Sequence, residues 1–281
     1  LVAAAGCVSP DELLVVLSPP PLPSPAQPTN GSLGVEPKTP PPEARHDGNA
    51  EKPIPSAIQK HLDDAVKLTD RDRFNAAIPI LEKALKAAIR EKHQVAETKI
   101  RIRLGHALFE GKEDSEGAEG HFRRALELAG ERSSSMRHTA LKGLGDMLLW
   151  AGRLDEGGAV IHASLEVAKS LGIQDAIGRS LISLSLLQRS LGHAEAAKSH
   201  LEDAIRIFLQ LSLTLKGDAQ KENSHALAAC YHNKAKLELD DGRPEEALAL
   251  YGKVEKHHRD SGDKLNSGKI HLLSGKLHCE N

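Results

Sequence analysis

The sequence predicts an all-α protein in which antiparallel helix pairs stack into an α-solenoid, preceded by a disordered, proline-rich tail. Two repeating patterns predict this fold class. One is a series of glycines placed between helix-like segments at intervals of 41, 40 and 50 residues: Gly111, Gly152, Gly192 and Gly242. The other follows each glycine: a small residue, a bulky apolar residue four positions later, and a small or apolar residue three positions beyond it. Self-similarity at about 40 residues is typical of stacked supersecondary units.

The low aromatic content agrees with a solenoid. Phe, Trp and Tyr together make up 2% of the 281 residues. A single large core normally uses large rings because each ring buries much area. A solenoid rich in Ala and Leu needs fewer of them, since each repeat packs only on its neighbours.

Residues 1–53 are expected to form the disordered tail. They hold most of the 15 prolines, which favour extended polyproline II and disrupt the interior of a helix. The stretch also lacks the periodic apolar residues that would offset the entropy of ordering. Pro20-x-x-Pro23 and Pro25-x-x-Pro28 fit the minimal pattern of an SH3 ligand, although a plain linker is the simpler interpretation.

From residue 54 the pattern becomes helical, with apolar residues at i, i+3, i+4 and i+7. We expect a solenoid over residues 54–281, with about five helix pairs and one terminal helix. Its first helices are expected at residues 56–68 and 72–92. The clearest pair covers 136–172: Gly152 closes its first helix, and acids at 155 and 156 open the second, where the helix dipole favours them.

Further glycines are expected to close the second helix of each pair: Gly130, Gly172, Gly217 and Gly262. Asp175, Asp218 and Asp263 follow the last three and are candidate N-terminal caps. The interval of 50 residues between Gly192 and Gly242 marks an insertion of about 10 residues. We expect the second helix of the third unit, about 194–215, to absorb part of it.

The repeated signature has a packing explanation. Residues at i, i+4 and i+7 share one stripe of a helix, and small residues in that stripe let two helix axes approach closely. The signature reads Ala77-Leu81-Ala84, Ala118-Phe122-Ala125, Gly157-Ile161-Ser164, Ala197-Leu201-Ala204 and Ala247-Tyr251-Val254.

These anchors, with Leu104-Gly105-x-x-Leu108, Leu144-Gly145-x-x-Leu148, Leu184-Ser185 and Tyr231-x-x-x-Ala235, resemble tetratricopeptide repeats over about residues 56–281. The period of about 40 residues, in place of 34, is similar to the longer variety found in kinesin light chains and Pins-type adaptors. The proline near the end of the family's unit is absent here. The resemblance implies a right-handed superhelix whose first helices line a concave groove.

The resemblance also implies which side chains face that groove and would contact a partner segment bound in it. They are Lys99, Ile102, Arg103, His106, Phe109, Lys142, Asp146, Trp150, Arg179, Ile182, Leu186, Arg189, His232, Asn233 and Lys236. Bases outnumber acids in this set. Chaperone-binding members of the family hold a terminal carboxylate with Lys and Asn. Lys142 fits such a position, but Asp146 stands where Asn would be needed.

Nothing in the sequence indicates catalysis, a metal or a cofactor. Walker, GxGxxG, HExxH and GxSxG motifs are absent. The 15 histidines include His225 and His232, which are two helical turns apart and too distant to share one metal alone. Cys7, Cys230 and Cys279 form no CxxC pair, which favours reduced thiols and a cytoplasmic location.

The balance of charge and apolar residues excludes some partners. A net charge of −2 argues against nucleic-acid binding. The sequence contains no run of 18 apolar residues, so no membrane span is expected. The leading hypothesis is a non-enzymatic adaptor that holds a protein or peptide segment, possibly acidic, in the groove. The alternative is the regulatory or sensor solenoid of a larger enzyme or transcriptional regulator, since the helix expected at 263–277 has no polar cap. A weaker third reading is a lipoprotein modified at Cys7.

Overall fold

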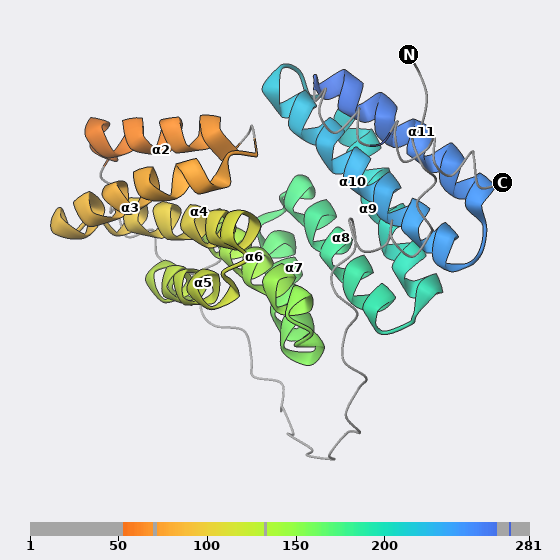
Figure 1. Ribbon diagram of the computed structural model, residues 1–281, viewed down its shortest axis with the longest axis horizontal. Coiled ribbons are helices and arrows are strands. Elements are labelled where there is room, and N and C mark those ends of the chain that lie inside the picture. Colours follow the sequence, from red (N-terminus) through yellow and green to blue (C-terminus); the bar gives the residue numbers. More distant parts are fainter. Residues whose placement is uncertain (1–52, 70–71, 132–133, 263–269, 271–281) are drawn as a thin grey trace, which may run out of the picture.

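The computed structural model describes residues 53–69, 72–131, 134–262 and 270, and over these residues the chain is helical without strands. The elements are α2 (Ser56–Thr69), α3 (Phe74–Arg90), α4 (Gln94–Lys112), α5 (Ser115–Ala129), α6 (Ser135–Trp150), α7 (Leu154–Leu171), α8 (Gln174–Ser190), α9 (Ala194–Ser212), α10 (Asp218–Asp240) and α11 (Pro244–Ser261). They follow one another in chain order across the molecule (Figure 1). The predicted all-α solenoid is therefore confirmed. The tail, up to residue 52, and the helix expected at 263–277, apart from residue 270, lie outside the described residues.

The helices form two layers. Each even-numbered helix packs on the odd-numbered helix that follows it, and α2, α4, α6, α8 and α10 also contact one another in succession. No two odd-numbered helices of the described part make comparable contacts. Because the even-numbered layer is packed more closely than the other, the stack curves around it. The even-numbered helices therefore form the inner, concave layer.

The repeated signature lies at the interface between the layers. All fifteen of its residues are buried, and Leu81, Phe122, Ile161 and Leu201 have no exposed surface. The buried apolar residues form four successive clusters along the stack, the largest running from α2 to α6. A core divided in this way is expected when each repeat contacts only its neighbours.

Glycines at the interface let neighbouring helices approach a bulky ring. A Cβ at Gly105 would lie 2.8 Å from the Phe122 ring, and one at Gly143 would lie 2.5 Å from it. In the same way, a Cβ at Gly178 would lie 2.6 Å from Phe208. The rings of α5 and α9 thus fill slots that only glycine leaves open on the inner helices.

The glycine turns follow the prediction in most units. Gly152 has φ of 75°, in the left-handed region that glycine adopts without a Cβ penalty, and it follows Ala151, the C-cap of α6. Gly192 and Gly242 have similar backbones after α8 and α10. Gly111 is different and the prediction for it is wrong. It lies inside α4, where an added Cβ would approach the Phe74 Cβ to 2.8 Å, and Glu113 adopts the left-handed conformation with φ of 54°.

The predicted aspartate caps are also wrong where the structure describes them. Asp175 lies within the first turn of α8, and Asp218 is the first residue of α10, so neither caps its helix. Side-chain caps occur elsewhere. The Asp114 carboxylate accepts from the Gly117 N–H at 2.9 Å, and the Ser134 hydroxyl accepts from the Arg137 N–H at 3.1 Å. Asp263 lies outside the described residues.

The insertion between the third and fourth units lengthens the inner helix more than the outer one. α10 has 23 residues against 17 in α8, whereas α9 has 19 against 18 in α7. The prediction that the second helix of unit three takes up the extra residues therefore holds only in small part. Asn223 ties the added turns to α9, because its amide donates to the Phe208 carbonyl at 3.0 Å and to the Ser212 hydroxyl at 2.7 Å.

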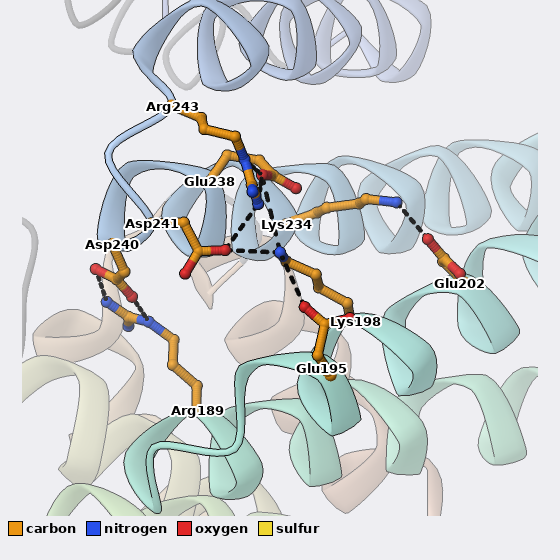
Figure 2. A network of polar contacts seen from close by, with 9 residues as sticks. All are labelled: Arg189, Glu195, Lys198, Glu202, Lys234, Glu238, Asp240, Asp241 and Arg243. Atoms are coloured by element: carbon orange, nitrogen blue, oxygen red, sulfur yellow. Dashed lines mark hydrogen bonds and ion pairs between the residues drawn. The ribbon is translucent and has the colours of Figure 1, made fainter.

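A charge network joins the last two pairs (Figure 2). Arg189 of α8 donates to both carboxylate oxygens of Asp240 on α10, at 2.6 and 3.1 Å. The Lys198 ammonium of α9 donates to Asp241 at 2.7 Å, and Arg243 joins Asp241 and Glu238 from the start of α11. Because Glu238 is buried, its charge needs compensation, which Arg243 and Lys198 supply. The network fixes the longer unit against its neighbour.

Candidate functional site: the inner groove

Two adjoining cavities lie along the inner helices. The first, of about 480 Å³, is an open hollow bordered by α2, α4 and α6. Its lining residues are Gln59, Leu62, Asp63, Val66, Lys99, Ile102, Arg103, His106, Ser135, Met136 and Thr139. Every lining residue comes from an even-numbered helix, as the curvature of the stack requires.

The second cavity, of about 570 Å³, continues from the first along α6 and α8 to α10. Its lining residues are Arg103, His106, Ser135, His138, Thr139, Lys142, Ile173, Asp175, Ala176, Arg179, Glu222 and His225. The two cavities share four of these residues, Arg103, His106, Ser135 and Thr139. They therefore form one continuous hollow, which we call the inner groove.

The bases of the inner groove fall into two groups. The Lys142 ammonium lies 2.6 Å from the Asp146 carboxylate, and the Arg179 guanidinium lies 2.8 Å from Asp175. Lys99 and Arg103, by contrast, have no ion-pair or hydrogen-bond partner among the described residues, and both are exposed. The first cavity therefore holds two uncompensated cations beside a single lining acid, Asp63.

Apolar side chains accompany these cations. Leu62 and Val66 of α2, Ile102 of α4 and Met136 of α6 line the same cavity. A surface that combines apolar side chains with two uncompensated cations suits a ligand with both apolar groups and carboxylates. Such a ligand can bury its apolar part while its charges stay paired.

His106 lies where the two cavities meet. Burial is the main cause that lowers its pKa to about 4, and the nearby Lys142 acts in the same direction. Its ring meets Phe122 edge to face with 5.0 Å between ring centroids. At neutral pH the ring is therefore uncharged and acts as part of the groove floor.

His138 forms a buried polar cluster behind the second cavity. Its Nε2 lies 3.1 Å from the Ser180 hydroxyl, which lies 3.2 Å from the Ser164 hydroxyl. Burial lowers the pKa of His138 as well. These hydrogen bonds join α6, α7 and α8. No carboxylate belongs to this cluster, so it is not a hydrolytic triad.

The described residues offer little for catalysis. No group of three or more His, Cys, Asp or Glu side chains in that part of the chain could hold a metal ion. Cys230 is a buried, free thiol, and burial raises its pKa to about 12, so it stays protonated at neutral pH. None of the helices of this part is long and apolar enough to cross a membrane.

The structure gathers part of the predicted site. The members that line the inner groove are Lys99, Ile102, Arg103, His106, Lys142 and Arg179. The others lie on the inner helices without lining either cavity: Phe109, Asp146, Trp150, Ile182, Leu186, Arg189, His232, Asn233 and Lys236. Most of the second set is in the later turns of α6, α8 and α10, whereas the groove follows their first turns.

Some residues of the second set have other roles. Trp150 is 50% exposed and meets Phe109 edge to face, with centroids 5.9 Å apart. His232 packs towards α11, with its ring centroid 5.7 Å from that of Tyr251, and burial lowers its pKa to about 4. Arg189 belongs to the charge network of Figure 2.

Sequence reasoning missed several groove residues. They are Gln59, Leu62, Asp63, Val66, Ser135, Met136, His138, Thr139, Ile173, Asp175, Ala176, Glu222 and His225. The sequence held a signal for the first four, which lie on the helix at 56–69. This helix is the first helix of a pair, as are the other inner helices. Continuing the series by one unit would have placed that helix in the inner layer.

Comparison with known families gives two matches. Family models described as tetratricopeptide repeat match residues 136–210 and residues 227–254. These spans cover α6 to α9 and much of α10 and α11. No curated protein is similar enough to this chain to count as a relative.

Solved structures share the fold at low sequence identity. A Rap protein complexed with Competence and Sporulation Factor superposes with a TM-score of 0.65 and 14% identity over 77% of this chain, which spans 58% of that protein's length. A thermophilic TPR protein of Thermus thermophilus gives 0.54 and 18%, with 79% of this chain and 100% of that chain covered. Putative kinesin light chain repeats from Podosopora anserina give 0.52 and 15%, with 73% and 96% covered. At these identities the similarity supports the fold alone.

Proposed function

We propose that this chain, whose residues 136–210 and 227–254 match models of the tetratricopeptide repeat, is a non-enzymatic scaffold that binds a segment of a partner protein in the inner groove. The observation that carries the proposal is the first cavity. There Leu62, Ile102 and Met136 lie beside Lys99 and Arg103, two cations with no partner among the described residues. The Rap protein with a similar fold was solved in complex with Competence and Sporulation Factor, which supports binding as the use of such a stack.

The proposed partner segment is short, carries aliphatic side chains and has one or two carboxylates. Lys142 and Arg179 contribute less to attracting it, because each already has an acidic partner on its own helix. A nucleic acid suits the groove poorly, since Asp63, Asp175 and Glu222 interrupt any run of positive charge. We also propose a cytoplasmic location, supported by the free thiol of Cys230.

Selection of random peptides on the full-length chain tests the proposal. We expect the selected peptides to combine acidic and aliphatic residues. Lys99→Glu/Arg103→Glu should weaken their binding by about ten- to a hundredfold, because two favourable charge pairs become repulsive. A matched control is Lys83→Glu/Lys86→Glu, which changes the net charge equally at exposed positions of the outer helix α3.

Circular dichroism of both variants shows whether each remains folded. Peptides that bind both variants equally well would remove the groove as the binding site. A set of selected peptides without carboxylates would leave the groove but refute the proposed charge preference.

A further inference from the structure

The tail contains a segment whose chemistry matches the first cavity. Residues 9–18 lie outside the described residues, and their sequence is Ser-Pro-Asp-Glu-Leu-Leu-Val-Val-Leu-Ser. Two acids, Asp11 and Glu12, precede five consecutive large aliphatic residues, 13–17. No other stretch of residues 1–52 has five such residues in succession.

The cavity offers the complement in both respects. Its apolar lining comes from α2, α4 and α6, and Lys99 and Arg103 are its uncompensated cations. Elsewhere in the groove the bases Lys142 and Arg179 are neutralised by acids on their own helices. An acidic segment followed by aliphatic residues is therefore matched by the first cavity better than by the second.

We propose that residues 11–17 bind in the first cavity of their own chain and compete there with the partner segment. The acids would pair with Lys99 and Arg103, and the aliphatic residues would contact Leu62, Val66 and Ile102. This inference rests on the proposed function in one respect, namely that the groove binds peptide segments.

The tether permits this contact. His93 fixes the chain before α2: its Nδ1 accepts from the Ala96 N–H, and its Nε2 donates to the Pro53 carbonyl at 3.2 Å. Gln59, on the wall of the first cavity, is six residues beyond Pro53. The tail therefore departs from one end of a helix that itself forms the groove.

The length of the tail also suffices. Residues 17 and 53 are separated by 36 positions, which span about 30–36 Å as a flexible coil and up to about 110 Å as fully extended polyproline II. That span exceeds the diameter of a helix, about 10–12 Å. At the flexible limit, a tether of this length gives an effective concentration on the order of 1 mM. A segment with an intrinsic Kd of roughly 100 µM would then fill the groove in about nine molecules of ten and weaken partner binding about tenfold.

Zero-length carbodiimide cross-linking of the full-length chain, read by mass spectrometry, tests the contact. This reagent joins a carboxylate to an amine only when they are adjacent, and the Lys99 amine is the target. We expect a link from Asp11 or Glu12 to Lys99 whose yield does not change on dilution. Glu36, Glu43, Asp47 and Glu51 are internal controls, since they lie nearer to Pro53 along the chain. Links to Lys99 that come mainly from these four acids would overturn the inference, because the tether alone would produce them.

Paired tail variants sharpen the test. Leu14→Asp/Leu17→Asp places charges in the aliphatic run and should abolish the link to Lys99. Leu22→Asp/Leu33→Asp makes the same change elsewhere in the tail and should leave it intact. A link that survives the first pair, or that appears only at high protein concentration, contradicts binding within one chain.

Partner affinity distinguishes this inference from the proposed function. Peptides selected for the groove should bind the Leu14→Asp/Leu17→Asp variant about tenfold more tightly than the unchanged chain. Equal affinities would refute the tail contact and leave the groove function intact. A confirmed cross-link without any groove-binding peptide would support the tail contact and refute the proposed function.

Discussion

The Phe122 ring is held between glycines of two inner helices, and Gly143→Ala tests this packing directly. A Cβ at Gly143 would lie 2.5 Å from the ring, closer than side-chain carbons normally approach. The ring cannot withdraw, because it is fully buried and Gly105 borders it, with a hypothetical Cβ 2.8 Å away. The substitution therefore overpacks the junction of α4, α5 and α6.

The magnitude follows from two opposing effects. Alanine in place of glycine inside a helix stabilises it by about 0.5–1 kcal/mol. Overpacking of a well-filled core costs about 1–3 kcal/mol. We expect Gly143→Ala to lower the free energy of unfolding by about 1–2 kcal/mol.

Gly120→Ala is the matched control. Gly120 lies inside α5, where an added Cβ would meet nothing within 4 Å. This variant keeps the gain in helix propensity without the collision, so it should be more stable than the unchanged chain by about 0.5–1 kcal/mol. The two alanine variants should thus shift stability in opposite directions.

Urea unfolding followed by far-ultraviolet circular dichroism measures both variants. Phe122→Leu replaces the ring with a smaller side chain and should relieve the collision with Ala at position 143. The double variant should therefore lose less free energy of unfolding than the sum of the two single losses. If Gly143→Ala stabilises the chain as much as Gly120→Ala does, the ring is not confined and the packing argument is wrong.

Three further predictions concern stability. The pKa of His106 is lowered from 6.5 to about 4, so the folded chain binds a proton less readily than the unfolded one. Stability should therefore fall as the pH drops from about 6.5 towards 4, by about 2 kcal/mol at pH 5, and His106→Gln should remove this part of the loss in urea titrations at pH 8 and 5. Lys198→Met should lower the free energy of unfolding by about 1 kcal/mol, and by less in high salt, because the Lys198 side chain is 14% exposed and lies between acids of α10 and of the turn that follows it. Lys67→Met is the control. The Lys67 side chain is 70% exposed in its ion pair, so this change should shift the urea midpoint little. Ser134→Ala removes the acceptor of the Arg137 N–H and should lower the free energy of unfolding by about 1 kcal/mol, which a lower thermal midpoint would show.

The interface between helix layers could be predicted from the sequence. The stripe formed by Ala118, Phe122 and Ala125 is fixed by helical periodicity alone, and these residues are fully buried. The turns were harder to predict. Gly111 matches the other glycines in spacing, yet it serves close helix packing while Glu113 adopts the left-handed backbone. Spacing cannot distinguish these two uses of glycine.

The groove was predicted less completely. Repeat position identifies the inner layer, but the curvature of the stack decides which turns of each helix border a hollow. The sequence also predicts that Lys142 and Arg179 are paired with acids, whereas Lys99 and Arg103 are not. Asp146 and Asp175 lie four residues from them on the same helix, and that spacing forms ion pairs.

The central claim is that a partner segment binds in the inner groove, and the two methionines of the chain test it most directly. Met136 lines the first cavity, whereas Met147 is 1% exposed in the core of the same helix. With ¹³C-methyl methionine, addition of a selected peptide should shift the Met136 signal and leave the Met147 signal in place. Lys99→Glu/Arg103→Glu should greatly reduce that shift. A peptide that binds while the Met136 signal stays unchanged would contradict the account.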